Sequence, residues 1–256
     1  MIEIPLLTII TGLLTISVRL TGLMLFAPFF SSGAIPIRIK AGLVIALTAV
    51  LYPVVGKGIS TYTLSQWPLL IVMEFLIGVG MGIATNLVFE AVQLGGALLS
   101  VQMGFSLANI LDPQSQVDTT VIPLFYQCIV MLLFLRMDVH IWILRAIGRS
   151  FTYLPPGATH LKGLFTLGVL TTGGEIFGLG VQIAAPVLSA TLVADIVLGL
   201  LSKASPQMPV MMLGPAIKSI LGIFILIATL KYWPDLFQNL FLDSIAKGER
   251  LLHLAR

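Results

Sequence analysis

The sequence predicts an all-α, polytopic membrane protein with kinked or broken helices and helical hairpins. Three observations indicate this fold class: a high apolar content, long apolar runs, and prolines and glycines placed where helices would bend. Of the 256 residues, 57% are hydrophobic and 10% are charged, whereas soluble domains are about 45–50% apolar and about 25% charged. We therefore expect residues 1–256 to form one membrane-embedded unit without a separate soluble domain.

Six apolar segments follow one another along the chain. They cover residues 4–30, 37–56, 68–100, 119–147, 176–201 and 207–232. Six spans of roughly 20 residues would use about half of the chain. Pro28 and Pro36 bracket the first turn, and Pro186 lies inside the fifth segment, where it should bend a helix.

The tail at residues 233–256 has a different pattern. Its apolar residues fall on one helical face: Leu236, Phe237, Leu240, Phe241, Leu251 and Leu252. Tyr232 and Trp233 precede it, and such aromatic residues favour the membrane interface. The pattern predicts an amphipathic interfacial or partner-docking helix.

Charged residues interrupt the apolar segments. They are Arg19, Glu74, Glu90, Arg136, Asp138, Asp195 and Lys218. A lipid-facing charge at the bilayer centre costs at least about 2.5–3.5 kcal/mol, so we expect most of these residues to face protein, water or the interface. The apolar excess should accordingly face neighbouring subunits more than lipid.

Lysines and arginines are unevenly divided between the alternate connections. If the N-terminus is cytoplasmic, that side receives Lys57, Arg145, Arg149, Lys162, Lys231, Lys247, Arg250 and Arg256. The opposite side receives only Arg38, Lys40 and Lys203. The positive-inside rule therefore predicts that both termini are cytoplasmic.

The third segment contains two glycines at a spacing typical of close helix contacts. Gly78 and Gly82 are four residues apart, and Glu74 falls on the same helical face. Two interpretations stay open: a close contact with a second helix beside a buried carboxylate, or a functional ion or proton site.

A second polar stripe follows in the same segment. Asn86, Glu90 and Gln93 share one helical face, away from Glu74. These side chains would either form hydrogen bonds inside a helix bundle or line a conduit.

A polar stretch separates the third and fourth segments. It extends from Gln102 to Thr120, and its candidate gate residues are Gln102, Gly104, Phe105, Asn109, Asp112, Pro113, Gln116 and Asp118. A polar loop at membrane depth is tolerated only against protein or water. The composition therefore favours a gating element.

Other chemistries find little support. Gly104 to Ala108 is near the Gly-x-Ser-x-Gly pattern of serine hydrolases, with His140 as a candidate base, but the last glycine is absent. The three histidines and one cysteine have no metal-ligand spacing, so we expect no catalytic residue, metal or cofactor. No basic run of four or more residues occurs, so nucleic-acid binding is not expected.

The last hairpin turn is rich in proline and methionine. Its residues are Pro206, Gln207, Met208, Met211 and Met212. Methionine usually fills irregular gaps in a core, although its flexible side chain also suits a surface that seals around varied cargo.

Taken in chain order, these motifs resemble the FliR family of the flagellar type III export gate, whose counterpart in virulence systems is SctT. The resemblance rests on Arg19, Ala27-Pro28, Ile35-Pro36, Arg38, Pro53, Glu74, Gly78, Gly82, Gly96, Gln102-x-Gly104, Asp112-Pro113, His140, Ser150-Phe151, Leu154-Pro155-x-Gly157, Ala185-Pro186, Gly199-Leu200-Leu201 and Pro206-Gln207-Met208. One departure is that Pro209-Val210-Met211 stands where the family usually has Asn-Val-Phe.

The resemblance implies a core subunit of the bacterial inner membrane, within the flagellar basal body. One copy would assemble with about five FliP and about four FliQ subunits into a channel for unfolded flagellar proteins, with FlhB and FlhA as further partners. It also implies a FliP-like part at about 1–170, a FliQ-like hairpin at about 171–232, and a loop at 102–120 that plugs the closed channel. Two alternatives are a virulence export gate and a secondary transporter that uses Glu74, Glu90 and Asp195 as ion or proton sites.

Overall fold

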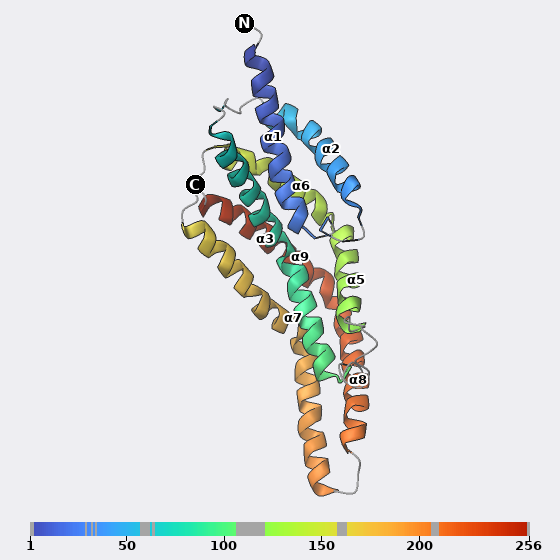
Figure 1. Cartoon of the computed structure of the whole chain (residues 1–256). Helices are drawn as coiled ribbons and strands as arrows, with labels where there is room; N and C mark the ends of the chain where they lie inside the picture. Colours follow the sequence, from blue (N-terminus) through green and yellow to red (C-terminus); the bar gives the residue numbers. More distant parts are fainter. Residues whose placement is uncertain are drawn as a thin grey trace. The chain divides into compact units, whose positions relative to one another are not determined.

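The computed structural model describes residues 3–28, 30–31, 33, 35–56, 62, 65–105, 121–157, 163–205 and 210–254. These residues form helices and turns and contain no strand, which confirms the all-α fold (Figure 1). The helices are α1 (Glu3–Phe26), α2 (Ile37–Val55), α3 (Trp67–Gln102), α5 (Val121–Arg136), α6 (Val139–Tyr153), α7 (Gly163–Ala204), α8 (Val210–Thr229), the short 3-10 helix η3 (Leu230–Tyr232) and α9 (Trp233–Leu254).

The described helices are long and apolar enough for a polytopic membrane protein. Five candidate spans cover Thr8–Phe26, Ile37–Val55, Trp67–Gln102, Leu167–Ala204 and Leu213–Leu252. The pair α5 and α6 makes a sixth if it is taken as one broken span. The break lies at Asp138, whose φ of 54° is left-handed and interrupts the helix.

Helix ends follow the proline and glycine pattern of the sequence. Pro36 precedes α2 with φ −57° and ψ 142°, a conformation suited to the start of a helix. Beyond α6, Gly157 takes a φ of +76°, which a residue with a side chain rarely adopts. Pro186 lies inside α7, and the backbone remains helical through it.

The described chain divides into two compact units, each built from segments far apart in the sequence. One contains residues 1–87, 138–174 and 241–256, and the other contains residues 88–137 and 175–240. The predicted division near residue 170 stays a prediction.

In the first unit, α1 and α3 approach closely through glycines. A Cβ atom at Gly78 would overlap the carbonyl oxygen of Arg19, and one at Gly22 would overlap that of Phe75. A Cβ at Gly82 would lie 2.8 Å from the Cβ of Phe26. The predicted close contact at Gly78 and Gly82 is thereby confirmed, and it places Arg19 beside Glu74.

In the second unit, aromatic side chains pack α5 against the start of α9. The ring of Trp233 lies 4.7 Å from that of Tyr126 and 5.5 Å from that of Phe237, measured between centroids. In Figure 1, α7 and α8 run side by side in opposite directions, as expected for the last hairpin.

The apolar face of α9 is covered by its own chain. Phe237, Phe241, Leu251 and Leu252 are each at most 4% exposed. The prediction of an interfacial or partner-docking tail is therefore wrong for this face, although the amphipathic pattern itself was correct. Periodicity shows that an apolar face must be covered, but not which surface covers it.

Candidate functional sites

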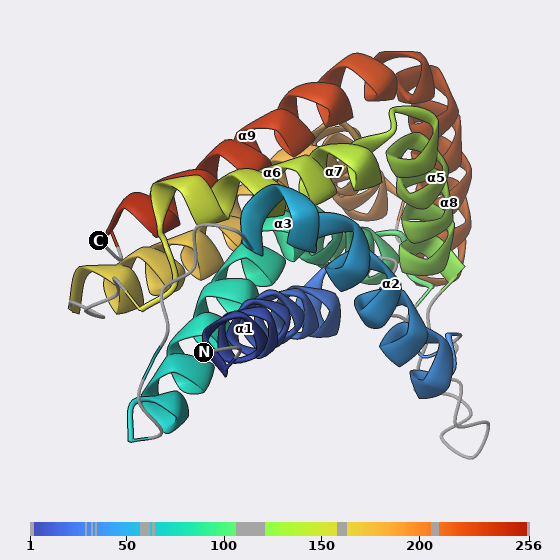
Figure 2. The ribbon, with the colours of Figure 1, turned by 90° about the horizontal axis from the view of Figure 1, so that it is seen from above.

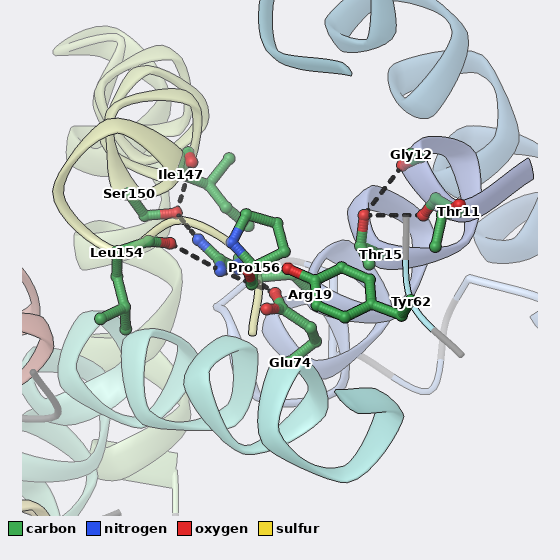
Figure 3. Close-up of polar contacts among 10 residues, drawn as sticks. All are labelled: Thr11, Gly12, Thr15, Arg19, Tyr62, Glu74, Ile147, Ser150, Leu154 and Pro156. Atoms are coloured by element: carbon green, nitrogen blue, oxygen red, sulfur yellow. Dashed lines mark hydrogen bonds and ion pairs between the residues drawn. The ribbon is translucent and has the colours of Figure 1, made fainter. Parts of the chain in front are cut away.

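The first candidate site is an ion pair buried between α1 and α3. The Nε and Nη2 atoms of Arg19 each lie 2.7 Å from Oε2 of Glu74. Both side chains are 0% exposed, and Figure 3 shows the two pointing toward each other. A charge buried alone is very costly, so each residue stabilises the burial of the other.

The end of α6 provides the remaining contacts of the guanidinium. Nη1 of Arg19 donates to the hydroxyl of Ser150 at 2.9 Å, and Nη2 donates to the carbonyl of Leu154 at 3.1 Å (Figure 3). The guanidinium carbon also lies 3.9 Å from the ring centroid of Phe151, a favourable cation–π distance. Arg19 thus connects three helices of one unit: α1, α3 and α6.

Tyr62 fixes the turn after α6. Its hydroxyl donates a hydrogen bond to the carbonyl of Pro156, and a Cβ at Gly157 would overlap its ring. Partial burial and the nearby Glu74 carboxylate raise the pKa of Tyr62. The phenol therefore remains a neutral donor beyond the pH at which a free tyrosine ionises.

The second candidate site joins three helices of the other unit at the base of the predicted gate loop. Asp195 of α7 accepts a hydrogen bond from Nε2 of Gln102 at 2.8 Å, and its other oxygen lies 2.9 Å from Nζ of Lys218 in α8. The Asp195 side chain is 41% exposed and that of Lys218 is 18% exposed. The pairing neutralises two charges that the sequence places inside apolar helices.

A second contact holds the residue after α3. The hydroxyl of Ser219 donates to the carbonyl of Met103 at 2.8 Å, and a Cβ at Gly222 would lie 2.6 Å from the Met103 side chain. We call Gln102, Met103, Asp195, Lys218 and Ser219 the loop anchor.

The predicted gate loop is only partly described. Gln102 is the last residue of α3, Gly104 takes a φ of +85°, and Phe105 is half-buried. Asn109, Asp112, Pro113, Gln116 and Asp118 lie outside the described residues, as does Ser106 of the hydrolase alternative. Sequence reasoning identified Asp195 and Lys218 as unusual charges but did not predict that they pair, because the pattern within each helix does not show which residues of a hairpin lie opposite one another.

The other predicted residues have varied environments. Glu90 is exposed, so it does not lie inside a bundle formed by this chain alone. Gln93 is exposed on the same stripe, whereas Asn86 is half-buried. Pro206, Gln207 and Met208 lie outside the described residues, and Met211 and Met212 belong to the first turn of α8. Within the described part of the chain, no group of three or more His, Cys, Asp or Glu could hold a metal ion.

Known proteins resemble this chain over most of its length. The model of a family described as bacterial export proteins, family 1, matches residues 10–244, which include both candidate sites. The flagellar biosynthetic protein FliR of Pectobacterium carotovorum is 30% identical over 224 residues, covering 88% of this chain and 86% of the relative. FliR of Escherichia coli K12 is 28% identical over 225 residues, covering 87% and 85%. FliR of Bacillus subtilis 168 is 26% identical over 246 residues, covering 94% of both chains. This chain therefore belongs to the bacterial export proteins, family 1, and is a relative of FliR.

Proposed function

We propose that this chain is a non-enzymatic core subunit of the flagellar type III export gate. With FliP and FliQ it forms the channel through which unfolded flagellar proteins cross the inner membrane, next to FlhB and FlhA. The observation that carries the proposal is the family match over residues 10–244, together with three relatives that are named as flagellar FliR. Those names also favour a flagellar over a virulence system.

The helix surfaces support a role within a larger assembly. In the apolar stretches of α1 and α3, 50% of the residues are buried inside the chain. The corresponding share is only 11% in α2 and 22% in α7. The exposed face of α3 also carries the polar residues Glu90 and Gln93. Lipid alone would be a poor neighbour for these exposed polar groups, whereas a partner subunit can pack against them.

The loop anchor supports a gating role for residues 102–120. Because Gln102 and Met103 are held by α7 and α8, the loop begins from a fixed position. A gate that acts by obstruction needs such an anchored base and no reactive group.

Co-purification tests this proposal. The tagged full chain, expressed with FliP and FliQ from the same genome, is expected to copurify with both in a complex that survives a native gel. Expression in a strain lacking its own FliR should restore motility. A chain that purifies only as a monomer or small homo-oligomer, and drives ion uptake into vesicles, would instead be a secondary transporter and would contradict the proposal.

A further inference from the structure

Two exposed arginines of α6 border a groove in the first unit. Arg145 and Arg149 are both exposed, and because they are four residues apart they share a helical face. Among the residues that the structure describes, neither guanidinium is paired with a carboxylate. Two positive charges held one turn apart on a helix are complementary to two negative charges with the same spacing.

The groove lies between α6 and the end of α2, and we call it the α2–α6 groove. It has a volume of about 620 Å³. Besides the two arginines, Val54 and Val55 of α2 line it, together with Phe151 and Pro156. Figure 2 shows α6 with the end of α2 on one side and α9 on the other. Apart from the two guanidinium groups, the lining therefore offers mainly apolar side chains.

The α2–α6 groove has few polar atoms for an extended peptide. The hydroxyl of Thr152, which also lines it, already donates to the carbonyl of Arg149, and Pro155 and Pro156 have no backbone N–H. An extended segment depends on hydrogen bonds from its backbone to the surface that it binds. An α-helix satisfies its own backbone and needs only side-chain contacts. The lining therefore favours a helix as the occupant.

The apolar surface continues from the groove along α2. Ile39, Val50 and Val54 fall on one face of this helix and are 60%, 67% and 80% exposed. Only 11% of the residues in the apolar stretch of α2 are buried inside the chain. A helix that lay along this face would cover these side chains and reach Arg145 and Arg149 where α2 ends.

The arginines determine which side chains the occupant needs. Guanidinium groups bind carboxylates in a fixed, forked geometry, and two acidic residues four positions apart on a helix have the same spacing as the two arginines. Arg145 and Arg149 also line a second groove, between α6 and α9, but the carboxyl group of Glu249 lies there and would repel an acidic partner. A free anion would leave the apolar face of α2 uncovered.

We infer that the α2–α6 groove binds a helix of a neighbouring subunit. Two carboxylates of that helix, one turn apart, pair with Arg145 and Arg149, and its apolar side chains lie against Val54 and the adjoining face of α2. The inference rests on the proposed function, because it takes the neighbour from the same complex. It adds the surface on which this neighbour docks and the chemistry by which it is recognised.

Photocrosslinking within the complete complex tests the inference. The full chain is expressed with FliP and FliQ from the same genome, with p-benzoylphenylalanine in place of Thr152, which is exposed and lines the groove. The crosslink is expected to map to a helix of a copurified subunit that has two acidic residues four positions apart. Because a crosslink reports on one contact, the other surfaces that hold the complex together do not mask the result.

Charge reversal tests the role of the arginines. Arg145→Glu/Arg149→Glu is expected to lower the crosslink yield about tenfold, because like charges would then face each other across the interface. Replacing the two mapped acidic residues of the partner with lysine should restore the yield, which a purely structural role of the arginines would not allow. Arg250→Glu is the matched control: Arg250 is exposed in the same unit but lines neither groove, so the yield should stay unchanged.

A further variant tests the apolar part of the α2–α6 groove without changing charge. A Cβ at Gly148 would meet only Leu51, at 3.8 Å, so Gly148→Leu should fold and fill the groove. The crosslink yield at Thr152 is expected to fall, whereas the resistance of the chain to proteolysis should not change.

The outcomes separate this inference from the proposed function. A chain that does not copurify with FliP and FliQ would contradict both. If the complex forms, three results would overturn the inference alone: crosslinking only to lipid, a mapped segment without the two acidic residues, or an unchanged crosslink yield in the charge-reversed chain.

Discussion

Arg19 shows how one residue can be unsuited to a membrane helix by itself and well placed in the folded chain. It is the largest of the fully buried side chains in the described part of the molecule, and each nitrogen of its guanidinium has a partner. Replacing such a pair with apolar residues can be neutral, whereas removing one partner is costly. The pair therefore specifies how α1, α3 and α6 meet more than it adds stability.

Glu74→Ala is expected to leave the Arg19 charge buried without its carboxylate and to destabilise the first unit by about 3–5 kcal/mol. Insertion into the membrane should stay near normal, whereas the yield of the assembled complex on native gels should fall severely. Normal complex yield would contradict a structural role for the pair.

The matched control is Glu90→Ala in the same helix. Glu90 is exposed in the chain, so its removal should leave the resistance of the first unit to proteolysis unchanged. The double variant Arg19→Met/Glu74→Leu should recover part of the loss, because it leaves no buried charge unpaired.

Gly82→Leu should force α1 and α3 apart, because a Cβ there already lies 2.8 Å from Phe26 and 2.9 Å from the carbonyl oxygen of Leu23. Overpacking typically costs about 1–3 kcal/mol, and here the backbone must also shift. We expect faster proteolysis of the chain in membranes and less assembled complex. Gly42→Leu, at a position with open space around it, should leave proteolysis unchanged; equal sensitivity of the two variants would refute the packing argument.

At the scale of elements, α3 carries the buried glutamate of one unit and ends in the loop anchor of the other. Its 36 residues are far more than the roughly 20 needed to span hydrocarbon. The sequence predicted this element at 68–100 and the polar stretch after it. It could not predict that Asp195 holds that end of α3, because its hydrogen bond with Gln102 joins residues 93 positions apart.

Deleting residues 109–116 of the predicted gate loop is expected to leave complex assembly intact but to make the membrane leaky to small ions, because the proposed obstruction would be removed. Ion leakage can be followed as loss of membrane potential in cells that express the complete gate. Unchanged conductance with normal assembly would refute a plugging role.

The loop anchor offers a milder version of the same experiment. Asp195→Ala removes the partner of both Gln102 and Lys218 and should cause a smaller leak. Asp243→Ala breaks only an exposed ion pair with Lys247 inside α9 and should cause none, since such pairs contribute about 0.3–0.5 kcal/mol.

At the scale of the whole molecule, the candidate spans differ in how much of their surface the chain itself covers. In the apolar stretches of α1 and α3, 50% of the residues are buried inside the chain, against 17% in the span at Leu213–Leu252. Lipid would be a poor neighbour for the exposed polar side chains of Glu90 and Gln93. The copurification experiment therefore tests the proposal that neighbouring subunits cover the spans that the chain leaves exposed.

Composition and periodicity were sufficient to predict the fold class, the apolar segments and the glycine contact, because each depends on residues close together in sequence. The family resemblance, which the comparisons confirm, also came from motifs in chain order. Only the tertiary structure decided that Glu74 pairs with Arg19, that Asp195 anchors the end of α3, that Glu90 is exposed, and that α9 buries its apolar face in its own chain. These outcomes depend on which helices meet, and a pattern within one helix shows that a face needs a partner without identifying that partner.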